Sequence, residues 1–415
     1  MQSQPSALTS FKNFLILFPA GLLLFILPFA RAHTPRLIAL LCAGIAVAIV
    51  WRKCAPPPIP LKIPFLLWIV VAFMSLLWAN NPGYSLGEIR NEIGYGLVTF
   101  LTFYCLTGTR RERDLWTVVL MAGLVVMSAF ALFYHGQHGG WFTEGAQGGV
   151  GGYSTYLITI LPVVAVILAQ TPLGKFPGNF LWLLVPAVLI TGYLTLNRAF
   201  WPTVGVEIIS FSLLLWGAKS HFKPSRWMLV AMIALVGLAS FQFINVAKQK
   251  SSPDMSAPAL MGFLSKDVRL ELWQYSADLI AQHPLTGVGF GKRAAQDILE
   301  KQFRPGLDHS HNLFVNYALQ MGLPGLAVIV LLFLAVMREF WRLYRSSESD
   351  LVLIGIGGIV LVLGVITKNM TDDFFFRESA LLFWAIVGIA LGYGKRRLRQ
   401  SSQSSGRQTH ELSFS

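Results

Sequence analysis

Charged residues are scarce in this chain. They make up 13% of its 415 residues, whereas hydrophobic residues make up 54%, and the mean hydropathy is +0.58. Soluble domains carry roughly 25% charged residues. The composition therefore excludes an ordinary soluble protein and predicts a polytopic membrane protein.

Cysteine is almost absent. The three cysteines, Cys42, Cys54 and Cys105, fall in or near predicted spans or inner loops. Their number and spacing allow neither a disulfide framework nor a CxxC metal site.

Acidic residues are also few. The chain has 20 Asp and Glu against 33 Lys and Arg, which gives a net charge of +13. A basic excess is compatible with nucleic-acid binding, but it also arises when Lys and Arg gather on the cytoplasmic side of membrane spans.

Long apolar runs dominate what is present. The run at residues 11–30 exceeds the roughly 7–15 residues of a signal-peptide core, so we interpret it as an uncleaved first span. A span needs roughly 20 apolar residues. The sequence predicts twelve spans, near 12–30, 36–51, 61–79, 88–107, 114–134, 153–171, 179–197, 199–217, 227–246, 324–341, 350–367 and 377–394.

The basic residues predict the orientation of these spans. With the N-terminus inside, the inner segments hold 19 of the 33 Lys and Arg, the short outer segments hold 6 and one long outer loop holds 8. The positive-inside rule then puts both termini in the cytoplasm. The basic excess is thus a topology signal, and we expect no nucleic-acid partner.

The long outer loop, residues 247–323, is predicted to form a helical domain of its own. Within 266–282, Val268, Leu272, Tyr275 and Leu279 lie on one helical face, and a Gly-rich turn and a second short amphipathic helix follow. The predicted organisation is spans 1–9 at 1–246, this loop domain at 247–323, spans 10–12 at 324–394, and a basic, disordered cytoplasmic tail at 395–415.

A polar stretch precedes the tenth span. In "DHSHNLFVNYALQMGLPG", Asp308 or Ser310 is a natural N-cap and Gly322 a natural C′ residue, which predicts His311 in the first turn of a short outer helix. The helix N-terminus disfavours a charged imidazole there, and a neutral imidazole is the form that a general base needs.

Two arginines join this histidine on the predicted outer side. Arg198, in "LNRAFWP", is flanked by apolar runs and is predicted at the outer mouth of a helical hairpin, while Arg269 lies on the amphipathic helix of the loop domain. Two guanidinium groups can hold a diphosphate bidentately. With His311 as the base, the set suits transfer from a lipid-linked phosphosugar whose leaving group is a diphosphate.

These motifs resemble a known family. His311-Asn312, nine residues and then Gly322-x-x-Gly325 resembles a signature of the O-antigen ligase and polymerase superfamily. The segment 269–291, with "HPLTGVGFG", resembles the outer loop of the same family, and Arg198 stands where the family has an arginine between two spans.

The resemblance implies an O-antigen ligase with a GT-C-like glycosyltransferase architecture. Such an enzyme is an inverting, metal-independent transferase of the bacterial inner membrane, without a cofactor. It moves a glycan from undecaprenyl diphosphate to the lipid A-core on the periplasmic face in lipopolysaccharide biosynthesis.

The resemblance also assigns residues. His311 matches the base, and Arg198 and Arg269 match the arginines that engage the diphosphate. A late acidic position of the family matches Asp372 or Asp373 loosely, and these two carboxylates can equally pair with Lys368 or Arg377. The remaining substrate-binding candidates are Asn312 and His309.

Other interpretations remain open at this point. A repeat-unit polymerase uses the same donor with another acceptor, and a protein O-glycosylating transferase is a more distant relative. A flippase or exporter of polyprenyl-linked glycans also needs cavity arginines, but it does not need His311 as a base. A zinc site is a further alternative, with ligands from His135, His138, His309 and His311 and Asp308 nearby.

Overall fold

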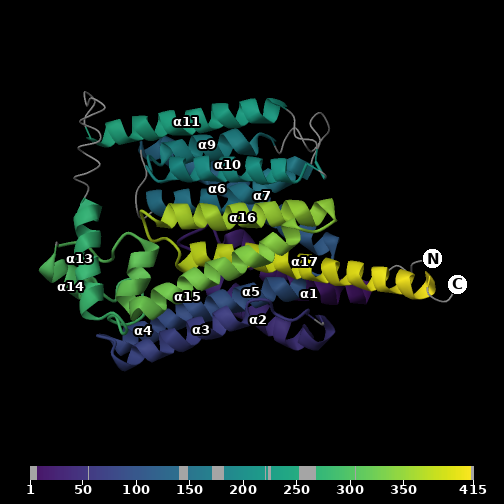
Figure 1. Ribbon diagram of the computed structural model, residues 1–415, viewed down its shortest axis with the longest axis horizontal. Coiled ribbons are helices and arrows are strands. Elements are labelled where there is room, and N and C mark those ends of the chain that lie inside the picture. The colour runs from purple at the N-terminus through teal and green to yellow at the C-terminus, as the bar shows by residue number, and fades with distance from the viewer. Residues whose placement is uncertain are drawn as a thin grey trace.

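The chain folds into a bundle of roughly parallel and antiparallel helices (Figure 1). The computed structural model describes residues 7–54, 56–139, 148–170, 182–219, 221–222, 226–251, 268–303 and 305–412. All regular elements in these ranges are helices. They are α1 (Ala7–Ile26), α2 (His33–Cys54), α3 (Lys62–Met74), η1 (Ser75–Leu77), α4 (Pro82–Glu88), η2 (Ile89–Gly94), α5 (Tyr95–Leu106), α6 (Arg110–His138), α7 (Gly149–Gln170), α9 (Leu184–Leu194), α10 (Phe200–Gly217), α11 (Arg226–Ser251), α13 (Val268–Gln282), α14 (Gln296–Gln302), α15 (Leu313–Tyr344), α16 (Ser349–Asn369) and α17 (Arg377–Leu412).

The helices confirm a polytopic membrane protein. Among the described residues, six helices are long and apolar enough to cross a membrane: His33–Arg52, Arg110–His138, Gly149–Gln170, Phe200–Gly217, Leu313–Tyr344 and Ser349–Asn369. Four shorter apolar helices coincide with further predicted spans, at Leu15–Ile26, Lys62–Leu77, Leu184–Leu194 and Ile233–Asn245. The total of twelve spans stays a prediction.

One end of the bundle carries the helices of the predicted loop domain. α13 runs across the ends of the bundle helices with α14 beside it, and the last turns of α17 lie at the opposite end (Figure 1). Leu272 of α13 packs with Val288 and Leu299, and Tyr275 and Leu279 pack against this cluster, so most of the predicted amphipathic face is confirmed. We call α13, α14 and their connection the helical subdomain, and the end that it covers the subdomain end.

One boundary differs from the sequence prediction, and one lies close to it. α15 consists of two helices that meet at a kink at Met321 and Gly322, next to the expected domain boundary at 323/324. α17 continues to Leu412, whereas residues 395–415 were expected to be a disordered tail. Residues 252–267 of the predicted loop domain and residues 413–415 lie outside the described part.

The kink in α15 follows from Gly322. Its φ of 67° is a left-handed conformation that suits the predicted C′ glycine, and Pro324 then opens the second half of the helix. A Cβ at Gly322 would lie 2.6 Å from the carbonyl oxygen of Pro284. Glycine therefore permits the connection after α13 to approach the kink.

An aromatic cluster fixes the connection between α16 and α17. The ring of Phe375 packs against Phe333 of α15 and against Phe383 and Trp384 of α17, at centroid distances of 5.3, 5.2 and 6.3 Å. Only 4% of Phe375 is exposed. Its burial anchors residues 370–376, which carry the acidic residues of the candidate site.

Candidate functional site

The structure brings three candidate residues together at the subdomain end. His309, His311 and Asp372 each offer a ligating atom within 4.8 Å of the others, and the two imidazole rings lie 4.1 Å apart. The histidines precede α15, whereas Asp372 follows α16. Chain segments about sixty residues apart thus form one cluster.

His311 does not sit where the sequence analysis expected it. The N-cap of α15 is Asn312, whose side-chain oxygen accepts hydrogen bonds from the backbone N–H groups of Phe314 and Val315. The prediction that Asp308 or Ser310 caps the helix, with His311 in its first turn, was wrong. Because the side chain of Asn312 accepts hydrogen bonds from both backbone N–H groups, the helix begins at Leu313, after His311.

The backbone of His311 is strained. Its φ of 53° is left-handed, and among the described residues only Leu196 and Arg377 are other non-glycine residues with positive φ. Such conformations cost about 1–3 kcal/mol and gather at functional sites. Leu196 is two residues from Arg198. One strained position is thus a candidate residue itself, and a second lies next to one.

Asp372 orients the imidazole of His311. Its Oδ1 lies 3.5 Å from Nδ1 of His311, and its Oδ2 lies 3.8 Å from Nζ of Lys368, which is fully buried. Burial raises the pKa of Asp372, but His311 and Lys368 outweigh this effect and hold the pKa at about 2. An ionised carboxylate beside Nδ1 favours the tautomer with the proton on that nitrogen, which leaves Nε2 as the acceptor.

His309 forms a second histidine–carboxylate pair. Its Nδ1 lies 2.5 Å from Oδ1 of Asp308, whose Oδ2 pairs with Nε of Arg293 at 2.8 Å. The hydrogen bond from His309 lowers the pKa of Asp308, and burial lowers the pKa of His309, which favours its neutral form. The side chain of His309 is 8% exposed and that of His311 is 28% exposed, so His311 is the more accessible base.

Asn312 and Asp373 make contacts that hold the site together. The amide of Asn312 donates to the carbonyl of Met370 at 2.9 Å, and the amide of Asn316 donates to Oδ2 of Asp373 at 2.7 Å. Lys292 donates to the Asp373 carbonyl and lies 4.0 Å from the ring centroid of Phe376. These contacts tie the 370–376 segment to α15 and to the helical subdomain.

Arg269 adjoins the cluster through its own helix. Trp273 lies one helical turn after Arg269 on α13, and its indole N–H donates to the carbonyl of Ser310 at 2.9 Å. Residues four apart share a helix face. Arg269 therefore lies on the face of α13 that meets the histidine segment.

Arg198 lies at the same end of the bundle. It sits in the connection between α9 and α10, as predicted. A Cβ at Gly364 of α16 would meet the carboxyl group of Glu207 of α10, and Ala218, just after α10, clusters with Val352 near the start of α16. The two helices are therefore antiparallel, and the start of α10 beside Arg198 lies at the same end as the end of α16.

The two glycine motifs contact each other directly. The N–H groups of Val288 and Gly289 donate to the carbonyls of Leu319 and Gln320, at 3.0 and 2.9 Å, and the N–H of Gly291 donates to the Gln320 side chain at 2.9 Å. The Gly-rich turn of "HPLTGVGFG" is thus bonded to the kink of α15. This contact sets the position of the helical subdomain over the histidines.

Lys292 and Arg293 were not predicted as site residues, because they contact Asp373 and Asp308, which are remote in sequence. The alternative that the Asp372 and Asp373 pair contacts Lys368 is borne out for Asp372, whose Oδ2 lies 3.8 Å from Nζ of Lys368.

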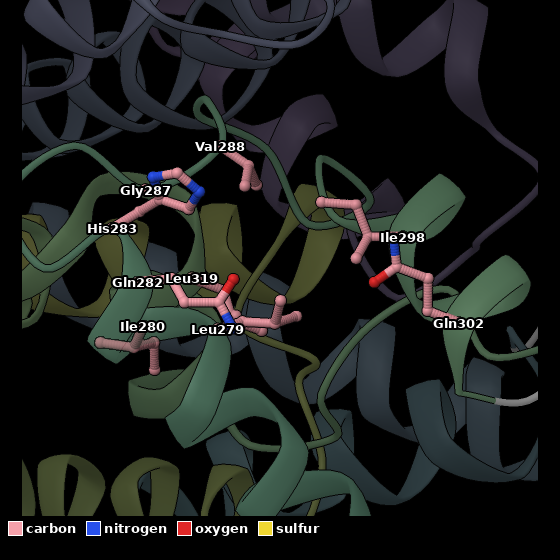
Figure 2. Close-up of a pocket in the computed structure, with 9 residues that line it drawn as sticks. All are labelled: Leu279, Ile280, Gln282, His283, Gly287, Val288, Ile298, Gln302 and Leu319. Carbon is pink, nitrogen blue, oxygen red and sulfur yellow. The ribbon is translucent and has the colours of Figure 1, made fainter.

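A cavity in the helical subdomain is separate from this site. It has a volume of about 160 Å³ and lies between α13, α14 and the Gly-rich turn, with His283 and Gln302 on opposite sides (Figure 2). None of the candidate residues lines it.

The cluster also has the composition of a metal site. Two imidazoles and a carboxylate are a ligand set that zinc accepts. His135 and His138, at the end of α6, do not join this cluster within the described residues, so the four-histidine alternative is not formed there.

Comparison with known proteins finds a family match over part of the chain. The family model described as O-antigen ligase matches residues 182–330, which include Arg198, Arg269, His309, His311 and Asn312. This match confirms the resemblance drawn from the motifs. No curated protein matches the chain.

Proposed function

We propose that this chain belongs to the O-antigen ligase family and transfers a glycan from undecaprenyl diphosphate to the lipid A-core. The observation that carries the proposal is the pairing of His311 with Asp372 at the subdomain end. His311 supplies the base. Arg269, on the face of α13 that meets the histidine segment, supplies a cation for the anionic leaving group.

The chemistry follows from these groups. The acceptor hydroxyl gives its proton to Nε2 of His311 while its oxygen attacks the anomeric carbon. The bond from that carbon to the diphosphate breaks, and the diphosphate leaves with the electron pair. Attack opposite the leaving group inverts the configuration.

Arg198 and Arg269 stabilise the charge that develops on the diphosphate. Fixed cations aimed at a leaving group are usually the largest contribution to such catalysis. The polyprenyl chain of the donor lies against apolar helix surfaces of the bundle.

The reaction is proposed to be metal-independent. Two fixed guanidinium groups neutralise the diphosphate, and Lys368 already compensates the charge of Asp372. If His309, His311 and Asp372 instead hold a cation, His311 is not available as a base.

The proposed setting is the inner membrane of a bacterium. The basic inner segments support cytoplasmic termini, and α17, which carries Lys395, Arg396 and Arg397, extends away from the helical subdomain (Figure 1). The subdomain end is then periplasmic, where both lipid substrates are exposed.

Reconstitution tests the proposal. The full chain in liposomes is given a polyprenyl-diphosphate glycan and purified lipid A-core, with and without chelator. Transfer to the core that survives chelation supports a metal-independent ligase. Extension of the glycan without core transfer identifies a polymerase, and movement of the glycan across the bilayer without bond formation identifies an exporter.

A further inference from the structure

A basic cleft lies beside the candidate site. It has a volume of about 430 Å³ and is bounded by residues of α2, η2, α5 and α17. Its basic lining residues are His33, Arg36, Arg90 and Arg377. We call this the basic cleft.

The charge of the basic cleft is poorly balanced. Three arginines line it, and no lining residue is acidic. Within the described part of the chain, the carboxylate that pairs with these arginines is that of Glu378, which lies 2.9 Å from Nη1 of Arg36. Asn91 adds a polar side chain next to Arg90. An anion in the cleft therefore gains charge-assisted hydrogen bonds.

Arg36 is buried in the wall of the cleft. It is 5% exposed, and Nη2 donates to the carbonyl of Phe29 at 2.7 Å. Its buried Nε has no hydrogen-bond partner among the described residues. Nη1 pairs with Glu378 and Nη2 with the Phe29 carbonyl, so Arg36 is a fixed positive charge in the cleft wall. The arginines exposed to an anion in the cleft are Arg90 and Arg377.

Arg377 is held toward the cleft by a strained backbone. Its φ of 47° is left-handed, and its guanidinium lies 5.6 Å from the ring centroid of Phe376. Left-handed conformations of non-glycine residues gather at functional sites, which agrees with a binding role for this arginine.

An apolar stripe continues from the cleft along α2. Leu37 lines the cleft, and Leu41, Ile45 and Ile49 follow at four-residue spacing. The four side chains are 37, 54, 60 and 75% exposed. A cationic pocket that leads onto an exposed apolar stripe matches a lipid with an anionic head group.

We propose that the basic cleft binds a lipid that carries a phosphate group. The phosphate pairs with the guanidinium groups of Arg90 and Arg377, whose planar forks match phosphate oxygens, next to the fixed charge of Arg36. An acyl chain lies along the stripe that begins at Leu37. This inference does not depend on the transfer reaction.

A lining residue of the basic cleft is close to the candidate site in the sequence. Asp372 contacts His311, and Arg377 lines the cleft five residues later. The phosphate group can come from a bilayer phospholipid or from a phosphorylated glycolipid acceptor, and both present the same chemistry to the arginines.

Native mass spectrometry of the full chain in detergent tests the proposal. The probes are phosphatidic acid and diacylglycerol with the same acyl chains, which differ only in the phosphate. The wild-type chain is expected to retain phosphatidic acid and not diacylglycerol. Arg90→Gln combined with Arg377→Gln is expected to weaken retention about tenfold or more, since each charged contact contributes on the order of a tenfold change.

A matched control distinguishes the loss of a contact in the cleft from a general effect of lower net charge. Lys301→Gln removes an exposed charge from α14, outside the cleft, and is expected to leave retention unchanged. Equal retention of both lipids, or an unchanged double variant, overturns the proposal. Displacement of phosphatidic acid by equimolar inorganic phosphate also overturns it, because the site then binds a free anion.

Two further probes assign the source of the phosphate. Lipid A and its dephosphorylated form are compared with phosphatidic acid in the same assay. Preference for phosphorylated lipid A makes the cleft an acceptor subsite, and equal binding of phosphatidic acid makes it a site for bilayer phospholipid. Both results support a phosphate-lipid site.

Discussion

The Nδ1 atom of His311 lies 3.5 Å from Oδ1 of Asp372, although the two residues belong to different connections of the bundle. The contact joins the segment before α15 to the segment after α16. The family match ends at residue 330, so it includes the histidine and not its carboxylate partner. Of the two acidic candidates, Asp372 is thus the one whose carboxylate lies beside His311, and we propose it as a positioning residue.

Replacement of Asp372 tests this role. Asp372→Asn keeps the shape but removes the charge that fixes the proton on Nδ1 of His311. General-base catalysis contributes about 10²–10⁴-fold, and we expect kcat to fall by at least about tenfold with little change in donor binding. Kinetics of glycan transfer measure the effect. Asp297→Asn, in the first turn of α14, is the control, and an unchanged kcat for Asp372→Asn speaks against the pairing.

His309 predicts a pH dependence of stability. Burial lowers its pKa, and Lys292 and His311 act in the same direction, although Asp308 opposes them. As pH falls below the usual histidine value of about 6.5, the unfolded chain takes up a proton that the folded chain does not. Stability is therefore expected to decrease from about pH 6.5 toward pH 5.

Thermal unfolding in detergent checks this dependence. The expected result is a lower Tm at pH 5 than at pH 7.5 for the wild-type chain, and a smaller difference for His309→Gln. His138→Gln, at an exposed position on α6, serves as the control. An identical pH profile for His309→Gln and the wild type contradicts the assignment.

The glycines of the subdomain connection provide a test of the fold. Gly287 has a φ of 65°, and a Cβ there would lie 2.5 Å from the backbone of Gln320. Gly306 has a φ of 81°, but a Cβ there meets nothing within 4 Å. Gly287→Ala combines strain with a clash, whereas Gly306→Ala adds strain alone, about 1–3 kcal/mol.

The comparison of the two variants is the informative measurement. Gly287→Ala is expected to lower Tm and glycan transfer well below those of Gly306→Ala. Equal effects of the two substitutions would mean that the contact between the Gly-rich turn and α15 does not position the helical subdomain.

Local patterns predicted much of the fold. Apolar runs predicted the long helices, and the spacing of Leu272, Tyr275 and Leu279 predicted the face that α13 buries. Arg198 was found at a helix–helix connection because an arginine between apolar runs has few other places to lie. Each of these sequence patterns depends only on residues that are close together in the sequence.

The contacts that build the site could not be predicted in this way. Lys292 meets Asp373 across 81 residues, and Asn316 meets Asp373 across 57 residues. The cap of α15 was misplaced because Asp308, Ser310 and Asn312 are all good N-cap residues, and tertiary contacts decide among them. Asp308 pairs with His309 instead, and Asn312 also bonds the 370–376 segment.

The most direct test of the account is glycan transfer by His311→Ala in liposomes, measured beside donor binding. We predict that transfer falls by at least about 10²-fold while the donor binds within about twofold of wild type, because the base is lost and both arginines remain. Transfer at the wild-type rate by His311→Ala would contradict the central claim that this imidazole accepts the proton of the acceptor.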